Sequence, residues 1–132
     1  MPSDRLTVVS RFLDRWIAGD RTVRDDEVHP DAELHTRLAA AAGEPYRGKE
    51  GIERWGRDLG ELWETMDLTV EEMIETDEGA VLVLSTAELA TRGSDVTFTQ
   101  PIAWLFTFRE GLPARMDVFQ NHADGRKAAG LL

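Results

Sequence analysis

VTFTQPIAWLFTFREGLPARMDVFQ, residues 96–120, is the stretch that decides the fold. Bulky side chains take alternate positions between Phe98 and Phe108, with Gln100 as the one polar member of the series. This alternation predicts a long strand with one wide apolar face. The chain then turns at residues 109–111 into a second strand, residues 112–120. A curved sheet with such a face, covered by helices, is expected to enclose a pocket.

The remaining elements are read outward from this hairpin. Apolar residues at three- and four-residue steps predict a first helix, capped by Ser3 or Asp4 and ending at residues 19–20, and a further helix that opens at Gly48. A last short helix is expected from an Asp124 cap to Gly130. Between these elements the pattern predicts a short helical piece and three strands, at residues 22–28, 32–38, 68–75 and 80–90.

Length and composition exclude several classes of protein. The 132 residues suit one domain, residues 1–132, and the helix-then-meander order predicts an α+β fold and not a parallel α/β fold. A net charge of −10 argues against nucleic acid as a partner, and no segment is apolar enough for a membrane span. With no cysteine and too charged an N-terminus for a signal peptide, we expect a cytoplasmic protein.

The register of the hairpin decides which side chains face inward. A three-residue loop at residues 109–111 places Trp104 opposite Met116 and Gln100 opposite Gln120. A two-residue loop places Trp104 beside Asp117 instead and gives the pocket an acidic floor. The first is preferred, because it leaves Asp117 in solvent and avoids the cost of burying an unpaired carboxylate. A bulge would change either register.

Two side chains are candidates for acid/base chemistry. His35 lies in the strand expected at residues 32–38, and its imidazole suits a general acid or base near neutral pH. The alternative is a half-buried structural histidine, since Leu34 or Thr36 can equally be the inward residue. Asp117 is the second candidate, provided that the register turns it inward. No metal site is expected, because the histidine spacing matches no zinc pattern.

Aromatic residues from separate parts of the chain are expected to line the pocket around a small apolar molecule. The amides of Gln100 and Gln120 can pair with each other or bind a ligand carbonyl, and His122 is placed near the rim. Ordinary core packing is the alternative for each aromatic ring. The predicted ligand-binding residues are Phe12, Trp16, Tyr46, Trp55, Gln100, Trp104, Phe106, Met116, Gln120 and His122.

Several short motifs occur together in a recognisable order. They are the Ala18-Gly19-Asp20 end of the first helix, HPDA at residues 29–32, YRGKEGI at residues 46–52, FREG at residues 108–111, and the tail at residues 128–131. In order and spacing the chain resembles the SnoaL-like, polyketide-cyclase-like branch of the nuclear transport factor 2 and ketosteroid isomerase superfamily. The resemblance implies a cone-shaped, curved antiparallel sheet with helices packed on its concave face around a cavity, and a homodimer formed through the sheet.

The resemblance carries over to activity only in part. The positions that match the ketosteroid isomerase base, oxyanion tyrosine and acidic partner fall at Thr36 or His35, at Phe12 and at Trp104, and none keeps the family's residue. The cyclases' His-Trp-Asp run reads Arg115-Met116-Asp117 in this chain.

Three hypotheses follow. The pocket belongs to a cofactor-free acid/base isomerase, cyclase or hydratase that acts on a polyketide- or steroid-like molecule, or to a non-catalytic binding protein for such a molecule. In the third, the chain is a dimerisation module whose outer sheet face meets a partner through Arg115, Asp117, Phe119 and Asn121.

Overall fold

The structure, a computed structural model, describes residues 4–131. Four helices and six strands follow one another as α1 (Asp4–Ile17), β1 (Glu33–His35), α2 (Arg37–Ala42), β2 (Tyr46–Arg47), α3 (Gly48–Leu62), β3 (Trp63–Glu75), β4 (Val81–Thr91), β5 (Thr97–Arg109), β6 (Leu112–Phe119) and α4 (His122–Ala128). The predicted α+β class is confirmed.

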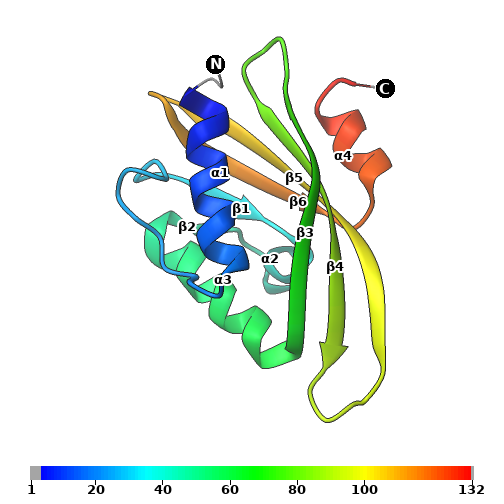
Figure 1. The fold of residues 1–132 in the computed structure, drawn as a ribbon. Helices are drawn as coiled ribbons and strands as arrows, with labels where there is room; N and C mark the ends of the chain where they lie inside the picture. The colour runs from blue at the N-terminus through cyan, green and yellow to red at the C-terminus, as the bar shows by residue number, and fades with distance from the viewer. Residues whose placement is uncertain (1–3, 132) are drawn as a thin grey trace.

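The six strands form one curved, open sheet in the order β2-β1-β6-β5-β4-β3 (Figure 1). Strands β3 to β6 make an antiparallel meander, as the alternating pattern predicts. One pair breaks the antiparallel rule, because β1 runs parallel to β6 and places His35 beside Asp117. The sheet is therefore mixed at the edge where the short strands lie.

The concave face, which carries Trp104 and Phe106, is covered by α1 and α3. The apolar stripe of α1 supplies Val9, Phe12, Leu13 and Trp16 to this main core, and α3 supplies Ile52, Trp55 and Leu59. Each stripe follows the three- and four-residue spacing that one helix face requires. The main core thus lies between two helices and the alternate residues of the long strands.

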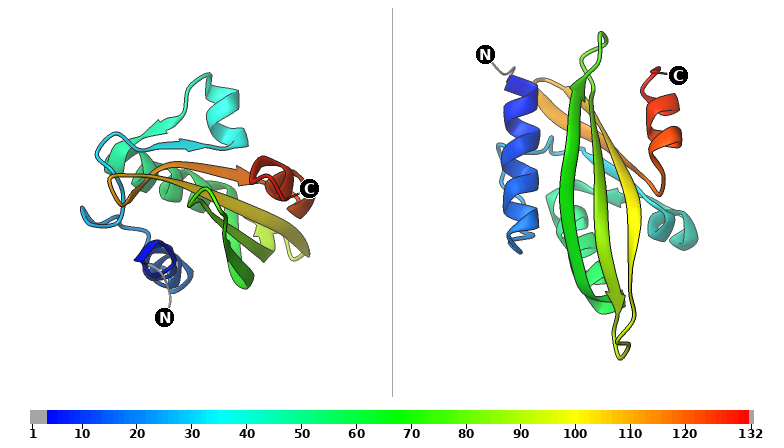
Figure 2. Two further views of the ribbon diagram at one scale, coloured as in Figure 1. Left: turned by 90° about the horizontal axis from the view of Figure 1, so that it is seen from above. Right: turned by 45° about the vertical axis from the view of Figure 1, so that its right-hand side comes forward.

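The fourth helix packs against the opposite, convex face, which the sequence did not predict. Figure 2 shows α1 and α4 on opposite sides of the long strands. A second apolar cluster lies under α4, formed by Leu82, Leu84, Ala103 and Leu105 with Phe119 and Ala129 packed against it. This cluster explains why the convex-facing residues of β4 and β5 are apolar only along part of their length.

The hairpin joining β5 to β6 starts in the register of the two-residue loop and then departs from both predicted registers. Arg109 pairs with Leu112 across a two-residue turn, in which Glu110 and Gly111 have φ of 56° and 82°. Positive φ at both positions is the requirement of a tight hairpin turn. A bulge then shifts the register by one, so that Trp104 pairs with Val118. Neither Met116 nor Asp117 is therefore the partner of Trp104.

The tight turn and the bulge nevertheless leave each residue on the face of the sheet that was predicted for it. A shift of two positions from the preferred register preserves parity, because side chains alternate between faces with a period of two. Met116 consequently packs in the concave core at 1 % exposure. Asp117 keeps to the convex face, where it pairs with Arg115.

Three local predictions were wrong. Residues 22–28 contain only turns, tied by a hydrogen bond from the Glu27 amide to the Arg24 carbonyl. The strand expected at residues 32–38 ends at His35, because Thr36 caps α2 by accepting a hydrogen bond from the Ala39 amide. The last helix begins one turn early, with Asn121 rather than Asp124 as its cap.

The close packing of α4 can be tested at Gly125. A Cβ added there would lie 2.4 Å from the Cβ of Ala103, which is fixed in a central strand, so α4 must move away from the sheet. We expect Gly125→Ala to lower the free energy of unfolding by about 1–3 kcal/mol. Urea denaturation monitored by circular dichroism measures the change.

Gly60 in α3 provides the matched control, because a Cβ added there meets nothing within 4 Å. Gly60→Ala should raise the free energy of unfolding by about 0.5–1 kcal/mol, since alanine favours the helix. Equal effects at the two positions would contradict the close approach of α4 to β5.

Candidate functional site

Three indole rings meet on the concave face where α1, α3 and β5 come together. The Trp16 and Trp55 rings stack with their centroids 5.6 Å apart, and Trp104 meets each of them edge to face at 5.5 Å. Phe106 stacks on Trp104 and meets Phe12 edge to face, both at 6.2 Å. Each such pair contributes about 0.5–1.5 kcal/mol beyond the area it buries.

These five rings fill their part of the concave face. Each is at most 3 % exposed, and the contacts above leave no room for a ligand between them. Phe12, Trp16 and Phe106 therefore act as core, and they do not line the pocket described next. Trp55 and Trp104 have both roles, because they also form the inner wall of that pocket.

A pocket of about 260 Å³ lies beside this cluster, between α2, α3 and the concave face of the sheet. We name it the concave pocket. Apolar side chains make up most of its wall, and they include three indoles and three aliphatic residues: Trp55, Trp63, Trp104, Leu59, Leu89 and Ile102. At its rim Phe98 meets Trp63 edge to face at 5.6 Å. The wall is suited to a flat apolar molecule.

Three polar side chains of the concave pocket lie next to one another. They are both predicted glutamines and Arg37 from the first turn of α2. The Arg37 Nη1 atom donates a 2.6 Å hydrogen bond to Oε1 of Gln120. The Gln100 amide donates a 2.7 Å hydrogen bond to the main-chain oxygen of Gln120. The two side-chain amides therefore do not pair with each other.

A buried donor without an acceptor lies in the same wall. The indole Nε1 of Trp104 has no hydrogen-bond partner among residues 4–131, although Trp104 is only 1 % exposed. An unsatisfied buried donor costs about 1–3 kcal/mol. Because this nitrogen is closed to water, the missing hydrogen bond is a cost borne by the core.

Three other predicted ligand-binding residues lie away from the concave pocket. Met116 is core, as described above. The Nε2 atom of His122 donates a 2.8 Å hydrogen bond to the main-chain oxygen of Ser85, which holds the start of α4 against β4. Tyr46 is buried, and its hydroxyl donates a 2.7 Å hydrogen bond to Asp58 on α3.

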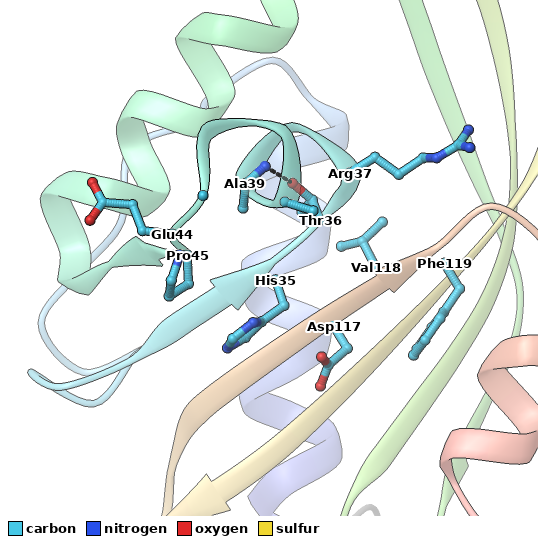
Figure 3. A pocket seen from close by; sticks show the side chains of 11 residues that line it. His35, Thr36, Arg37, Ala39, Glu44, Pro45, Asp117, Val118 and Phe119 are labelled. Carbon is cyan, nitrogen blue, oxygen red and sulfur yellow. Dashed lines mark hydrogen bonds between the residues drawn. The ribbon is translucent and has the colours of Figure 1, made fainter.

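The two predicted acid/base residues come together, but on the convex side. Leu34 is the inward residue of β1, so its neighbour His35 points the other way. His35 and Asp117 line a second, larger pocket of about 470 Å³ between α2, β1 and β6, which we name the convex pocket (Figure 3). Thr36, Arg37 and Val118 line both pockets.

Ion pairs occupy both of these residues. Asp117 accepts two hydrogen bonds from the Arg115 guanidinium, at 3.0 and 3.1 Å, and this bidentate contact raises the pKa of Arg115. His35 Nε2 lies 3.0 Å from Glu33, which Arg47 also contacts. Hydrogen bonds from His35 and then Arg47 lower the pKa of the Glu33 carboxyl. A catalytic role for His35 or Asp117 stays a prediction.

Of the residues described around the concave pocket, Arg37 is the one that is charged, and the sequence reasoning missed it, as it missed Trp63 and several aliphatic residues of the wall. Reading residues 32–38 as a strand hid Arg37, although the signal for a helix was present. Thr36 is a good cap, the run Arg37–Ala42 is rich in alanine, and Gly43 follows with φ of 87°. A helix starting at residue 37 brings the arginine to the end of β6.

The comparisons with known proteins agree with this geometry. A sequence model described as the SnoaL-like domain matches residues 9–116. The chain belongs to the SnoaL-like domain family. That assignment confirms the resemblance noted in the sequence, and it covers every strand of the sheet except the end of β6. Among the curated proteins, none matches the chain.

Solved structures share the fold of this SnoaL-like protein at low sequence identity. A nuclear transport factor 2-like protein of unknown function from Burkholderia pseudomallei K96243 has a TM-score of 0.78 and 17 % identity, covering 97 % of this chain and 98 % of its own. A ketosteroid isomerase-like protein from Catenulispora acidiphila DSM 44928, in complex with trimethylamine, has a TM-score of 0.71 and 16 % identity, covering 95 % and 93 %.

A third structure is TerC co-crystallised with polyporic acid, with a TM-score of 0.71 and 21 % identity, covering 97 % and 99 %. At these identities the three structures establish the fold alone. Within residues 4–131, no group of metal-ligating side chains and no helix long and apolar enough to cross a membrane is found.

Tyr46 provides a spectroscopic test of the α3 contacts, because it is the single tyrosine of the chain. Burial and the hydrogen bond to Asp58 raise the pKa of Tyr46 to about 12. Folding therefore gains stability that is fully present below the unfolded pKa of about 10 and is lost as the pH rises towards 12. Phenolate absorbance should show this late titration.

Asp58→Asn removes the charge while keeping an acceptor for the hydroxyl, so the midpoint should move down towards 10. A wild-type titration near the ordinary tyrosine pKa would contradict the Tyr46–Asp58 contact.

Proposed function

We propose that this SnoaL-like protein binds a small, flat, mostly apolar molecule in the concave pocket. The observation that carries the proposal is the pocket wall itself, in which Trp55, Trp63 and Trp104 border an unfilled volume with few polar residues in its lining. This combination is typical of small-molecule sites.

The size of the pocket limits the ligand. Its volume of about 260 Å³ lies below the roughly 300–1,000 Å³ of most ligand sites. A molecule of one or two fused rings suits this volume better than a four-ring steroid or polyketide. The proposed ligand class is therefore a bicyclic or smaller aromatic compound that carries an oxygen acceptor.

Binding without acid/base catalysis fits the lining best. Among the described residues that line the concave pocket, none is Asp, Glu, His, Lys or Tyr. Arg37 stays protonated at neutral pH and does not act as a general base. His35 and Asp117 lie on the other side of the sheet edge, so acid/base chemistry would require a substrate in the convex pocket.

Binding can be measured with 2-acetylnaphthalene, a neutral bicyclic ketone, through quenching of tryptophan fluorescence and by calorimetry. A ligand of this size gains about 0.3 kcal/mol or more per non-hydrogen atom, so we expect a Kd of about 1 mM or tighter. Val118→Phe places a ring in the concave pocket and should weaken binding at least about tenfold.

The control is Thr99→Leu, an added apolar group on an exposed position of β5, which should bind the ketone as the wild type does. Unchanged affinity in Val118→Phe would remove the concave pocket as the binding site.

For the oligomeric state, we propose that the convex pocket lies in an interface with a second copy of the chain. Its wall combines the apolar residues Ala40, Pro45 and Phe119 with the His35 and Asp117 side chains. Two ion pairs, Arg47–Glu33 and Arg115–Asp117, add positive and negative groups beside it. A surface that carries both signs of charge can be complementary to itself across a two-fold axis.

Sedimentation of two matched variants tests the interface. Ala40 and Ala41 are neighbouring exposed residues of α2, and only Ala40 lines the convex pocket. The wild type should sediment as a dimer at micromolar concentration, Ala40→Arg should shift it to monomer, and Ala41→Arg should leave the dimer intact. A monomeric wild type would overturn the proposal.

A further inference from the structure

We infer that the concave pocket selects ligands that carry a carboxylate, and that Arg37 is the residue that recognises it. The inference rests on the binding role proposed above and adds the chemical class of the ligand's polar group. It begins from the composition of the pocket wall, in which three indoles are joined by one linked group of polar side chains.

Arg37 is the only charged residue among the described residues that line the concave pocket. Its one hydrogen-bond partner within residues 4–131 is the neutral amide oxygen of Gln120, at 2.6 Å. Figure 3 shows the Arg37 side chain extending away from His35 and Asp117, so the carboxylate of the convex pocket is not its counterion. The guanidinium thus has a neutral partner and no counterion among these lining residues.

A ligand carboxylate is a stronger partner than this amide. Both contacts are charge-assisted, but the carboxylate adds the attraction of opposite charges, and a guanidinium can contact both carboxylate oxygens at once. Arg37 is exposed, so it gives up little hydration when it exchanges one partner for another. The Gln120 amide that is released can turn its N–H donors towards the same carboxylate.

The surroundings favour a single negative charge over a double one. Among the described residues that line the pocket, one arginine and two neutral amides, from Gln100 and Gln120, form the linked polar group, and no second cation joins them. The chain as a whole carries a net charge of −10, which disfavours a phosphate dianion. The inferred ligand is therefore an aromatic monocarboxylate, with its ring against the indoles and its carboxylate at Arg37.

Two probes of the same shape distinguish the contribution of the ligand's charge from that of its aromatic rings. The probes are 2-naphthoate, a carboxylate at neutral pH, and 2-naphthamide, its neutral analogue, each titrated by calorimetry and tryptophan fluorescence. We expect the wild type to bind naphthoate about tenfold more tightly or better, and the difference to shrink as salt is raised. Arg37→Gln should remove the preference, so that this variant binds the two probes equally.

Two further variants make the test specific. Gln120→Glu keeps Arg37 but gives it an internal carboxylate, so naphthoate should bind no better than naphthamide. Arg57→Gln is the control, since Arg57 is an exposed arginine of α3 that does not line the concave pocket, and it removes the same charge. This control should keep the wild-type preference.

The outcomes distinguish the two proposals. Equal binding of both probes by the wild type would leave the binding function standing and overturn the carboxylate inference. A preference lost equally in Arg57→Gln and Arg37→Gln would also overturn it, because the effect would then be one of net charge. Binding of neither probe, nor of 2-acetylnaphthalene, would instead remove the proposed function itself.

Discussion

Trp104 is the contact through which the sheet and both concave helices are joined. Its ring meets Trp16 of α1 and Trp55 of α3 edge to face, and Phe106 stacks on it from the same strand. The centroids of the three indole rings lie within 5.6 Å of one another, so both helices pack against the Trp104 ring. The concave pocket exists because this cluster fills only part of the concave face.

The sequence was sufficient for the class of fold and for the faces of the long strands. Apolar residues alternate in β5 and follow helical spacing in α1 and α3 because one face of each element is buried. These patterns predict the buried face even where the element bounds are predicted inexactly. The pairing register of β5 and β6 was less predictable. It depends on the tight turn at Glu110 and on the bulge in β6, and the local sequence pattern indicates neither of them. Their combined effect preserved the faces of Met116 and Asp117.

The site was predicted only in part. Gln100, Gln120, Trp55 and Trp104 do line the concave pocket, because strand parity and helix periodicity fix where they point. His35 could not be oriented from the sequence, since β1 is three residues long and too short to show a pattern. Short elements are positioned by their neighbours, here by parallel pairing with β6, and such non-local contacts leave little trace in local sequence.

The two pockets share part of their lining where β6 ends and α2 begins. Val118 borders the pocket on each side, as do Thr36 and Arg37 at the start of α2. Any molecule that shifts this shared lining from one side changes the space available on the other. Thermodynamic linkage then makes the effect mutual, so a second copy seated on the convex side and a small molecule on the concave side would strengthen or weaken each other's binding by the same factor.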